Sequence, residues 1–190
     1  MTRATVPTVR GRGRGLPLMA VAQLVLVMLV TACSADPRDD PQVAARLDLD
    51  GVTVVLRWHT GAAHRADSLP TATLTATLIP DTAGFHLYGQ SLPQDGVDGI
   101  GRPTRLDVGL GLAADGSVTA DRQERLDVVA GTHRLVPVYP AGPVTLSVPV
   151  RVTPGRPLRA WLSWAACSEQ VCLAPVIRQP VDLPLPAPRP

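Results

Sequence analysis

The sequence predicts an all-β domain, an immunoglobulin-like β-sandwich, preceded by a cleaved signal peptide and a short tether. Two observations carry this prediction. Apolar residues alternate with polar ones along several short segments, which is the pattern of strands with one buried face. The 20 Pro and 16 Gly among 190 residues favour short elements separated by turns over long helices. Apolar residues make up 45% of the chain, enough for the core of a single domain.

The first 32 residues are typical of an export signal. Four arginines precede the apolar stretch from Leu16 to Val30, which is short for a membrane span. The stretch ends in Val30-Thr31-Ala32-Cys33, which resembles the lipobox of bacterial lipoproteins, where the cysteine is lipidated and becomes the new N-terminus. We therefore expect cleavage after residue 32, lipidation of Cys33, and a tether over residues 33–45. An ordinary secretory signal with an incidental cysteine is the alternative; in both cases the rest of the chain leaves the cytoplasm.

The domain itself is expected over residues 46–185, with a Pro-rich tail over 186–190. The alternation is clearest in Thr71–Ile79, where every second residue is Ala or Leu. The predicted strands, in chain order, are Leu47–Leu49, Val52–Trp58, Thr71–Ile79, Gly84–Tyr88, Arg105–Leu112, Arg125–Val129, Val144–Val152, Leu158–Ala165 and Pro175–Leu183. Turn signals such as Asp95-Gly96, Asp115-Gly116 and Pro154-Gly155 separate several of them.

Two short segments, Pro41–Arg46 and Ala62–Ser68, are weak helix candidates. Trp58 and Trp161 lie in predicted strands, and we expect both to pack in the core.

The composition excludes several classes of function. The chain has no Lys, so its 18 basic residues are all Arg, and Schiff-base or P-loop chemistry is excluded. The formal net charge is only +2, and no basic cluster outside the signal segment indicates nucleic acid as a partner. We expect no cofactor.

Cys167-Ser168-Glu169-Gln170-Val171-Cys172 is the most informative segment, because lipidation of Cys33 would leave these two as the only thiols. Five extended steps would separate the two residues by about 17 Å, and a disulfide needs Cα atoms within about 4.4–6.8 Å. A disulfide here therefore requires a chain reversal.

Three interpretations of this pair stay open at the level of sequence. A structural disulfide is common outside the cytoplasm, and a redox-active pair would cycle by thiol–disulfide exchange. A metal site is the third. It would need His59, His64, His86 or His133, and the cysteine spacing does not match the usual zinc pattern.

The run from Trp164 to Val176, with an aromatic residue before the Cys pair and Pro175 soon after it, resembles the signature of the N-terminal domain of the thiol:disulfide interchange protein DsbD. Gly84-Phe85-His86-Leu87-Tyr88 with Gly101-Arg102-Pro103-Thr104, and Tyr139 with Gly142–Leu146, are similar to that family upstream. The resemblance covers residues 46–185. It departs from the family in two ways: the membrane and thioredoxin-like domains of DsbD are absent, and Trp164 stands where Tyr is common.

The resemblance implies a redox domain of immunoglobulin-like fold. Cys167 and Cys172 would be its redox pair, and Cys172 the one that forms the mixed disulfide. The implied partners are a membrane-embedded electron donor and exported thioredoxin-fold proteins. A lipid anchor would hold the domain on the extracytoplasmic face of the cell membrane or envelope. By analogy with the family's protective cap, Phe85 to Leu92, with Phe85, His86 and Tyr88, would cover the pair, and ordinary core packing is the alternative for Phe85 and Tyr88.

Other neighbours could tune the pair. Trp164 and Pro175 are candidates for a wall of the site, and His86 is a candidate proton acceptor. Glu169 would disfavour a thiolate if it pointed inward, and Arg159 or Arg178 would favour one if the fold brought it near.

Two functions besides exchange fit the sequence. One is a non-catalytic immunoglobulin-like envelope lipoprotein with a structural disulfide, and the other is an extracytoplasmic metal-binding protein. Whether the chain is a protein-disulfide reductase component is left open by the sequence.

Overall fold

The computed structural model describes residues 42–60, 71–130 and 133–187. In these residues all regular structure is strand, and the predicted all-β sandwich is confirmed. The predicted signal segment, Cys33, the predicted tether up to residue 41 and the helix candidate Ala62–Ser68 lie outside the described residues. No helix in the described part of the chain is long and apolar enough to cross a membrane.

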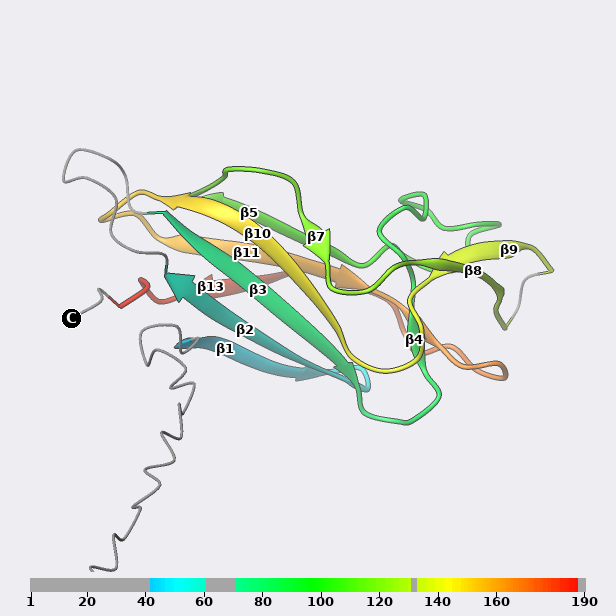
Figure 1. Cartoon of the computed structure of the whole chain (residues 1–190). Coiled ribbons are helices and arrows are strands. Elements are labelled where there is room, and N and C mark those ends of the chain that lie inside the picture. Colours follow the sequence, from blue (N-terminus) through cyan, green and yellow to red (C-terminus); the bar gives the residue numbers. More distant parts are fainter. Residues whose placement is uncertain (1–41, 61–70, 131–132, 188–190) are drawn as a thin grey trace, which may run out of the picture. The chain divides into compact units, whose positions relative to one another are not determined.

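The larger sheet has six strands (Figure 1). Five follow the order β1-β2-β3-β10-β6, and β7 also pairs with β10. All the pairings are antiparallel. The bounds are β1 Gln42–Leu49, β2 Val52–Thr60, β3 Thr71–Pro80, β6 Leu112–Ala114, β7 Thr119–Ala120 and β10 Val144–Val152.

A second sheet has the order β13-β11-β5, again antiparallel. Its strands are β5 Arg105–Leu110, β11 Leu158–Trp164 and β13 Val176–Leu183. The inward residues of both sheets form one buried cluster, which makes them the two layers of a sandwich. The predicted alternation is confirmed in β3, whose Ala72, Leu74, Ala76 and Leu78 are all buried.

Two further ladders lie beyond the ends of the long strands, at the right of Figure 1. One joins β4 (His86–Leu87) to β12 (Ala166–Cys167), and the other joins β8 (Arg125–Val128) to β9 (Leu135–Val138). These short strands build the site described below.

The helix candidate at Pro41–Arg46 is wrong, because Gln42–Leu49 is a strand paired with β2. The two strands are joined by Asp50-Gly51, both with positive φ (48° and 74°). Positive φ at both central residues is the geometry of a type I′ hairpin, and Asp-Gly is its favoured sequence. Pairing with β2 therefore decides the conformation of a segment whose own helical preference is weak.

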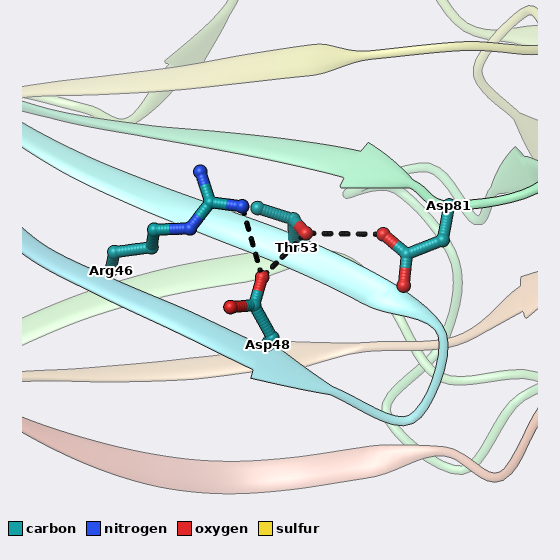
Figure 2. Close-up of polar contacts among 4 residues, drawn as sticks. All are labelled: Arg46, Asp48, Thr53 and Asp81. Carbon is teal, nitrogen blue, oxygen red and sulfur yellow. Dashed lines mark hydrogen bonds and ion pairs between the residues drawn. The ribbon is translucent and has the colours of Figure 1, made fainter.

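A polar contact ties this hairpin to the end of β3 (Figure 2). The Thr53 hydroxyl lies 2.6 Å from Asp48 Oδ1 and 3.1 Å from Asp81 Oδ1. Arg46 forms an ion pair with Asp48 at 3.2 Å. The hydrogen bond from Thr53, followed by Arg46, holds the pKa of the Asp48 carboxyl below its usual value. The contact joins β1, β2 and the turn after β3.

The two tryptophans predicted for the core differ. Trp58 is buried, and its indole N–H donates to the Pro184 carbonyl at 3.1 Å. Trp161 is not in the core: it is half-buried on the outer face of β11, where the Arg178 guanidinium lies 5.4 Å from its ring centre. Strand alternation explains the difference, because Ala160 and Leu162 take the inward positions of β11.

Candidate functional site: an asymmetric disulfide

Cys167 and Cys172 form a disulfide, with Cα atoms 4.0 Å apart. The chain reverses between them as the pairing requires. The Ser168 N–H donates to the Val171 carbonyl at 2.8 Å, and the Leu173 N–H donates to the Ala166 carbonyl at 2.9 Å. The Ser168 hydroxyl accepts from the Val171 N–H at 3.1 Å. Hydrogen bonds thus define this turn independently of the sulfur–sulfur bond.

The two cysteines differ in exposure. Cys167 ends the short strand β12 and is 1% exposed, whereas Cys172 lies on the far side of the turn and is exposed. Glu169, Gln170 and Val171, at the tip of the turn, are exposed as well. A thiolate approaching from solvent therefore meets Cys172 before Cys167.

The ladder of β4 and β12 separates two apolar clusters. Along Phe85–Tyr88, Phe85 and Leu87 join the main core, whereas Tyr88 joins a smaller cluster that also contains Cys167. Along the partner segment, Ala166 joins the main core. Successive side chains of a strand point to opposite faces, so one face of the ladder belongs to the sandwich and the other to the disulfide.

Tyr88 contacts the buried sulfur directly. Its hydroxyl oxygen lies 3.2 Å from Cys167 Sγ, and because a disulfide sulfur carries no proton, the hydroxyl is the donor. Tyr88 is fully buried, and burial raises the pKa of its hydroxyl to about 12. The group therefore stays a protonated donor throughout the physiological pH range.

The backbone around Tyr88 fixes the position of this hydroxyl. The Tyr88 N–H donates to the Ala165 carbonyl at 3.2 Å, and the Tyr88 carbonyl accepts from the Thr104 hydroxyl at 2.6 Å. Gly101 lies against the ring: a Cβ at this position would come within 2.6 Å of it. Gly101 also has φ +83°, a conformation that favours glycine.

The hairpin of β8 and β9 covers the cluster that contains Cys167. Its buried residues Val136 and Val138 pack there, and the Ala130 carbonyl beyond β8 lies 3.9 Å from Cys172 Sγ. The family resemblance predicts a cover from Phe85 to Leu92. The structure places Phe85 in the main core and Tyr88 and Leu92 in the small cluster, whereas the contact with Cys172 comes from Ala130.

His86 lies opposite Cys167 in the β4–β12 ladder. Its side chain is 7% exposed, and its Nε2 has no hydrogen-bond partner among the described residues. The ring meets that of Tyr88 edge to face, with centres 6.3 Å apart. Burial lowers the pKa of His86, so its imidazole is neutral at neutral pH.

The other candidate residues lie at varied distances from this arrangement. Trp164 is buried in the main core, and its Nε1 has no hydrogen-bond partner among the described residues. Pro175 is exposed between Cys172 and β13. Arg159 is paired with Asp182 at 2.7 Å, and Arg178 stacks on Trp161, so each of these guanidinium groups has its own partner.

The metal interpretation finds no support in the described part of the chain, where no group of three or more His, Cys, Asp or Glu side chains could hold a metal ion. His59 lies on β2, where its Nε2 is hydrogen-bonded to the Thr75 hydroxyl at 3.2 Å. His64 lies outside the described residues.

Sequence reasoning missed Thr104, Gly101 and Ala130 as parts of the site. Thr104 and Gly101 stand in the Gly101–Thr104 segment quoted for the family resemblance, so a signal existed for them. Ala130 offers none, because it acts through its backbone carbonyl.

No family model matches the chain, and no curated protein matches it. Among solved structures, the fold is similar to the N-terminal periplasmic domain of ScsB from Proteus mirabilis, with a TM-score of 0.49 and 13% identical residues. The match covers 75% of this chain and 51% of that one, so the chain spans about half the length of that structure.

Proposed function

We propose that this chain is an extracytoplasmic, lipid-anchored thiol:disulfide exchange protein. It passes electrons between a membrane-embedded donor and thioredoxin-fold partners through Cys167 and Cys172. The observation that carries the proposal is the asymmetry of the disulfide. Cys172 is exposed, while Cys167 is buried with the Tyr88 hydroxyl on its sulfur.

This asymmetry gives the exchange a direction of attack. A partner thiolate attacks Cys172 Sγ and forms a mixed disulfide, and the Cys167–Cys172 bond breaks with its electron pair on Cys167 Sγ. The Tyr88 hydroxyl is placed to donate a hydrogen bond to that departing thiolate. The partner's second thiolate then attacks its own half of the mixed disulfide and releases Cys172. Two electrons have passed to the pair, and two protons are taken up.

The reverse sequence oxidises the pair. The Cys172 thiolate attacks a partner disulfide, and Cys167 then displaces the partner from Cys172. The family resemblance of the segment from Trp164 to Val176 supports the same assignment of roles.

The competing function is a non-catalytic immunoglobulin-like envelope module whose disulfide only staples a turn. In the loop-entropy model a ring of this size adds about 2 kcal/mol to stability. The turn is already closed by backbone hydrogen bonds from Ser168 and Leu173. A structural disulfide would therefore add little to a turn that hydrogen bonds already close. A structural role also gives no reason for Cys172 to be exposed.

The reduction potential decides between the two. The full-length protein is equilibrated in thiol–disulfide buffers, and the alkylated fraction of the peptide that carries Cys167 and Cys172 is measured by mass. We expect a value more oxidising than about −250 mV, in the range of exchange proteins. A value below about −300 mV, typical of structural disulfides, would overturn the proposal.

Trapping tests the roles of the two cysteines. Cys167→Ser leaves Cys172 without its resolving thiol, so mixed disulfides with partners should accumulate in the cell envelope. Cys172→Ser is the matched control and should trap far less, because the remaining thiol is buried. Equal trapping by both variants would contradict the assigned order of attack.

The anchor is tested separately. Growth with labelled palmitate should label the unaltered chain and not Cys33→Ala. Label on the variant, or none on the unaltered chain, would remove lipidation at Cys33 from the proposal and leave the exchange chemistry standing.

A further inference from the structure

Two polar residues adjoin Cys167 and differ in their chemistry: Tyr88, whose hydroxyl contacts the sulfur, and His86, which pairs with Cys167 across the ladder. The Tyr88 hydroxyl donates a hydrogen bond to the Cys167 sulfur, but its pKa of about 12 means that it does not give up its proton at neutral pH. A neutral phenol is also a poor base, so Tyr88 cannot take a proton from a thiol. His86 is the cross-strand partner of Cys167. Side chains paired in this way have Cβ atoms about 4.5–5.5 Å apart, on the same face of the ladder.

The imidazole of His86 is buried and incompletely bonded. Its Nε2 has no hydrogen-bond partner among the described residues, although buried polar atoms normally have one. Such an orphaned atom in a native site calls for an explanation, and a redox or catalytic role is one of the recognised ones.

Thiol–disulfide exchange would give Nε2 of His86 a role as a proton acceptor. In the disulfide Cys167 carries no proton, so His86 has nothing to accept from it. In the reduced protein Cys167 carries a thiol proton, and that proton must leave before its sulfur can attack Cys172. Cys167 is buried at 1% exposure, so water has poor access to it.

The charged and titratable groups around His86 favour its neutral, accepting form. Burial is the largest influence on its pKa and lowers it. From β8, Asp127 raises the pKa and Arg125 lowers it, and these two form an ion pair with each other at 3.0 Å. Tyr88 on its own strand and Cys167 on β12 complete the surroundings.

We propose that His86 is the proton acceptor for Cys167 in the step that resolves the mixed disulfide. The proton passes from Cys167 Sγ to Nε2 of His86. The thiolate then attacks Cys172 Sγ, the bond from Cys172 to the partner breaks, and the partner sulfur leaves with the electron pair. The imidazolium returns the proton to solvent or to the departing thiolate. In the opposite direction the imidazolium protonates the Cys167 thiolate. This inference rests on the proposed exchange function.

The test uses the full-length protein, reduced with dithiothreitol and freed of it, and glutathione disulfide as the oxidant. Samples are quenched in acid over time, and mass spectrometry counts the mixed disulfide and the Cys167–Cys172 disulfide. The two steps, attack by Cys172 and resolution by Cys167, are thereby timed separately at each pH from about 6 to 9.

For His86→Gln we expect resolution at pH 7 to be slower by at least about 100-fold, the usual effect of a lost general base. Its rate should rise tenfold per pH unit, because hydroxide must take the proton. In the unaltered protein resolution should be nearly flat above about pH 6.5, the ordinary pKa of histidine. At each pH, the rate at which Cys172 attacks glutathione disulfide should agree within about twofold between the variant and the unaltered protein. His59→Gln, at the exposed histidine on β2, is the matched control and should behave as the unaltered protein.

Two results would overturn the inference. One is a His86→Gln variant whose resolution keeps the pH profile of the unaltered protein. The other comes from the unaltered protein alone and does not depend on a variant that folds: its resolution must be nearly independent of pH above about pH 6.5. Resolution that rises tenfold per pH unit in the unaltered protein would refute the proposal.

Failure of the exchange function looks different. In that case the unaltered protein would form neither the mixed disulfide nor the internal disulfide with glutathione disulfide.

Discussion

Replacing Tyr88 by phenylalanine removes one hydroxyl from the site and leaves the buried ring in place. The hydroxyl lies 3.2 Å from Cys167 Sγ, so the variant loses the donor that faces the leaving thiolate. Hydrogen bonds to charged groups contribute about 1.5–3 kcal/mol. We expect about half of this in the transition state, because Brønsted coefficients near 0.4–0.5 indicate a half-transferred charge. The resulting loss of about 0.7–1.5 kcal/mol slows attack on Cys172 by about 3- to 13-fold.

The assay is reduction of the full-length oxidised protein by dithiothreitol at pH 7, quenched in acid and counted by alkylation. Tyr139→Phe is the matched control. Tyr139 is also buried, at 1% exposure, and its pKa is also raised to about 12, first by burial and then by Glu124. Its hydroxyl, however, donates to Gln90 Oε1 at 3.3 Å and not to sulfur. Tyr139→Phe should be reduced at the rate of the unaltered protein.

Two outcomes would refute this reasoning. Tyr88→Phe could react as fast as the unaltered protein, in which case the hydroxyl gives the thiolate no support. Both variants could instead be slowed alike, in which case loss of a buried hydroxyl disturbs the fold and the contact with sulfur has no special part.

Three further predictions concern stability. The pKa of Tyr88 and of Tyr139 is about 12 in the fold against 10 for the free side chain, chiefly because burial disfavours the phenolate, so the free energy of unfolding should fall by about 2–3 kcal/mol per tyrosine as the pH rises from 10 to 12. Urea unfolding at pH 9 and pH 12 should show this fall, and a double Phe variant that keeps the full fall would contradict it. Gly101→Ala and Gly99→Ala both place a side chain at positive φ (83° and 79°), so both should lower the melting temperature. Only the Cβ of Gly101→Ala meets the Tyr88 ring, so only this variant should alter the rate of reduction by dithiothreitol. Equal rates of reduction in the two variants would argue against the contact with Tyr88. Thr53→Val removes the hydroxyl that lies between the Asp48 and Asp81 carboxylates and should lower the free energy of unfolding by about 1 kcal/mol in urea titration. Thr53→Ser keeps the hydroxyl and should keep most of that free energy. An equal loss of stability in both variants would assign the effect to packing of the methyl group.

The long strands were predictable because their burial is one-sided. Val144–Val152 was predicted with its observed bounds, and β3 extends only one residue beyond its predicted range. In both, one face packs in the core; alternation is complete in β10, and Thr75 is the one outward residue of β3 that is also buried. The short strands were harder: β7, β9 and β12 were not predicted, because two to four residues carry too little periodicity.

The false helix at Pro41–Arg46 has a specific cause. Ala and Arg within it are good helix formers, but the segment lies beside β2 and pairs with it. Asp50-Gly51 was the signal that could have corrected the prediction, since an Asp-Gly turn implies a strand on each side.

The site was predictable in its chemistry and not in its geometry. The sequence identified Cys167, Cys172, Tyr88 and His86, because cysteine pairs and the residues near them are visible in any chain. It could not indicate which sulfur is exposed, because that depends on where the hairpin of β8 and β9 lies. The end of that hairpin meets Cys172 through the Ala130 backbone carbonyl, 42 residues away in sequence.

The position of the disulfide outside the main core has a physical consequence for its chemistry. The sandwich core and the Cys167 cluster are separated by the β4–β12 ladder, so the two sets of side chains pack independently. Sub-global opening of a small unit takes less free energy than global unfolding. Under the proposed function, a partner that attacks Cys172 would need to displace only the end of the β8–β9 hairpin at Ala130, while the β4–β12 ladder that carries Cys167 stays in place. A structural disulfide would stabilise the fold most by joining distant parts of the main core. Cys167 lies outside that core, in the smaller cluster, so breaking the bond is expected to leave the sandwich folded, as the proposed exchange requires.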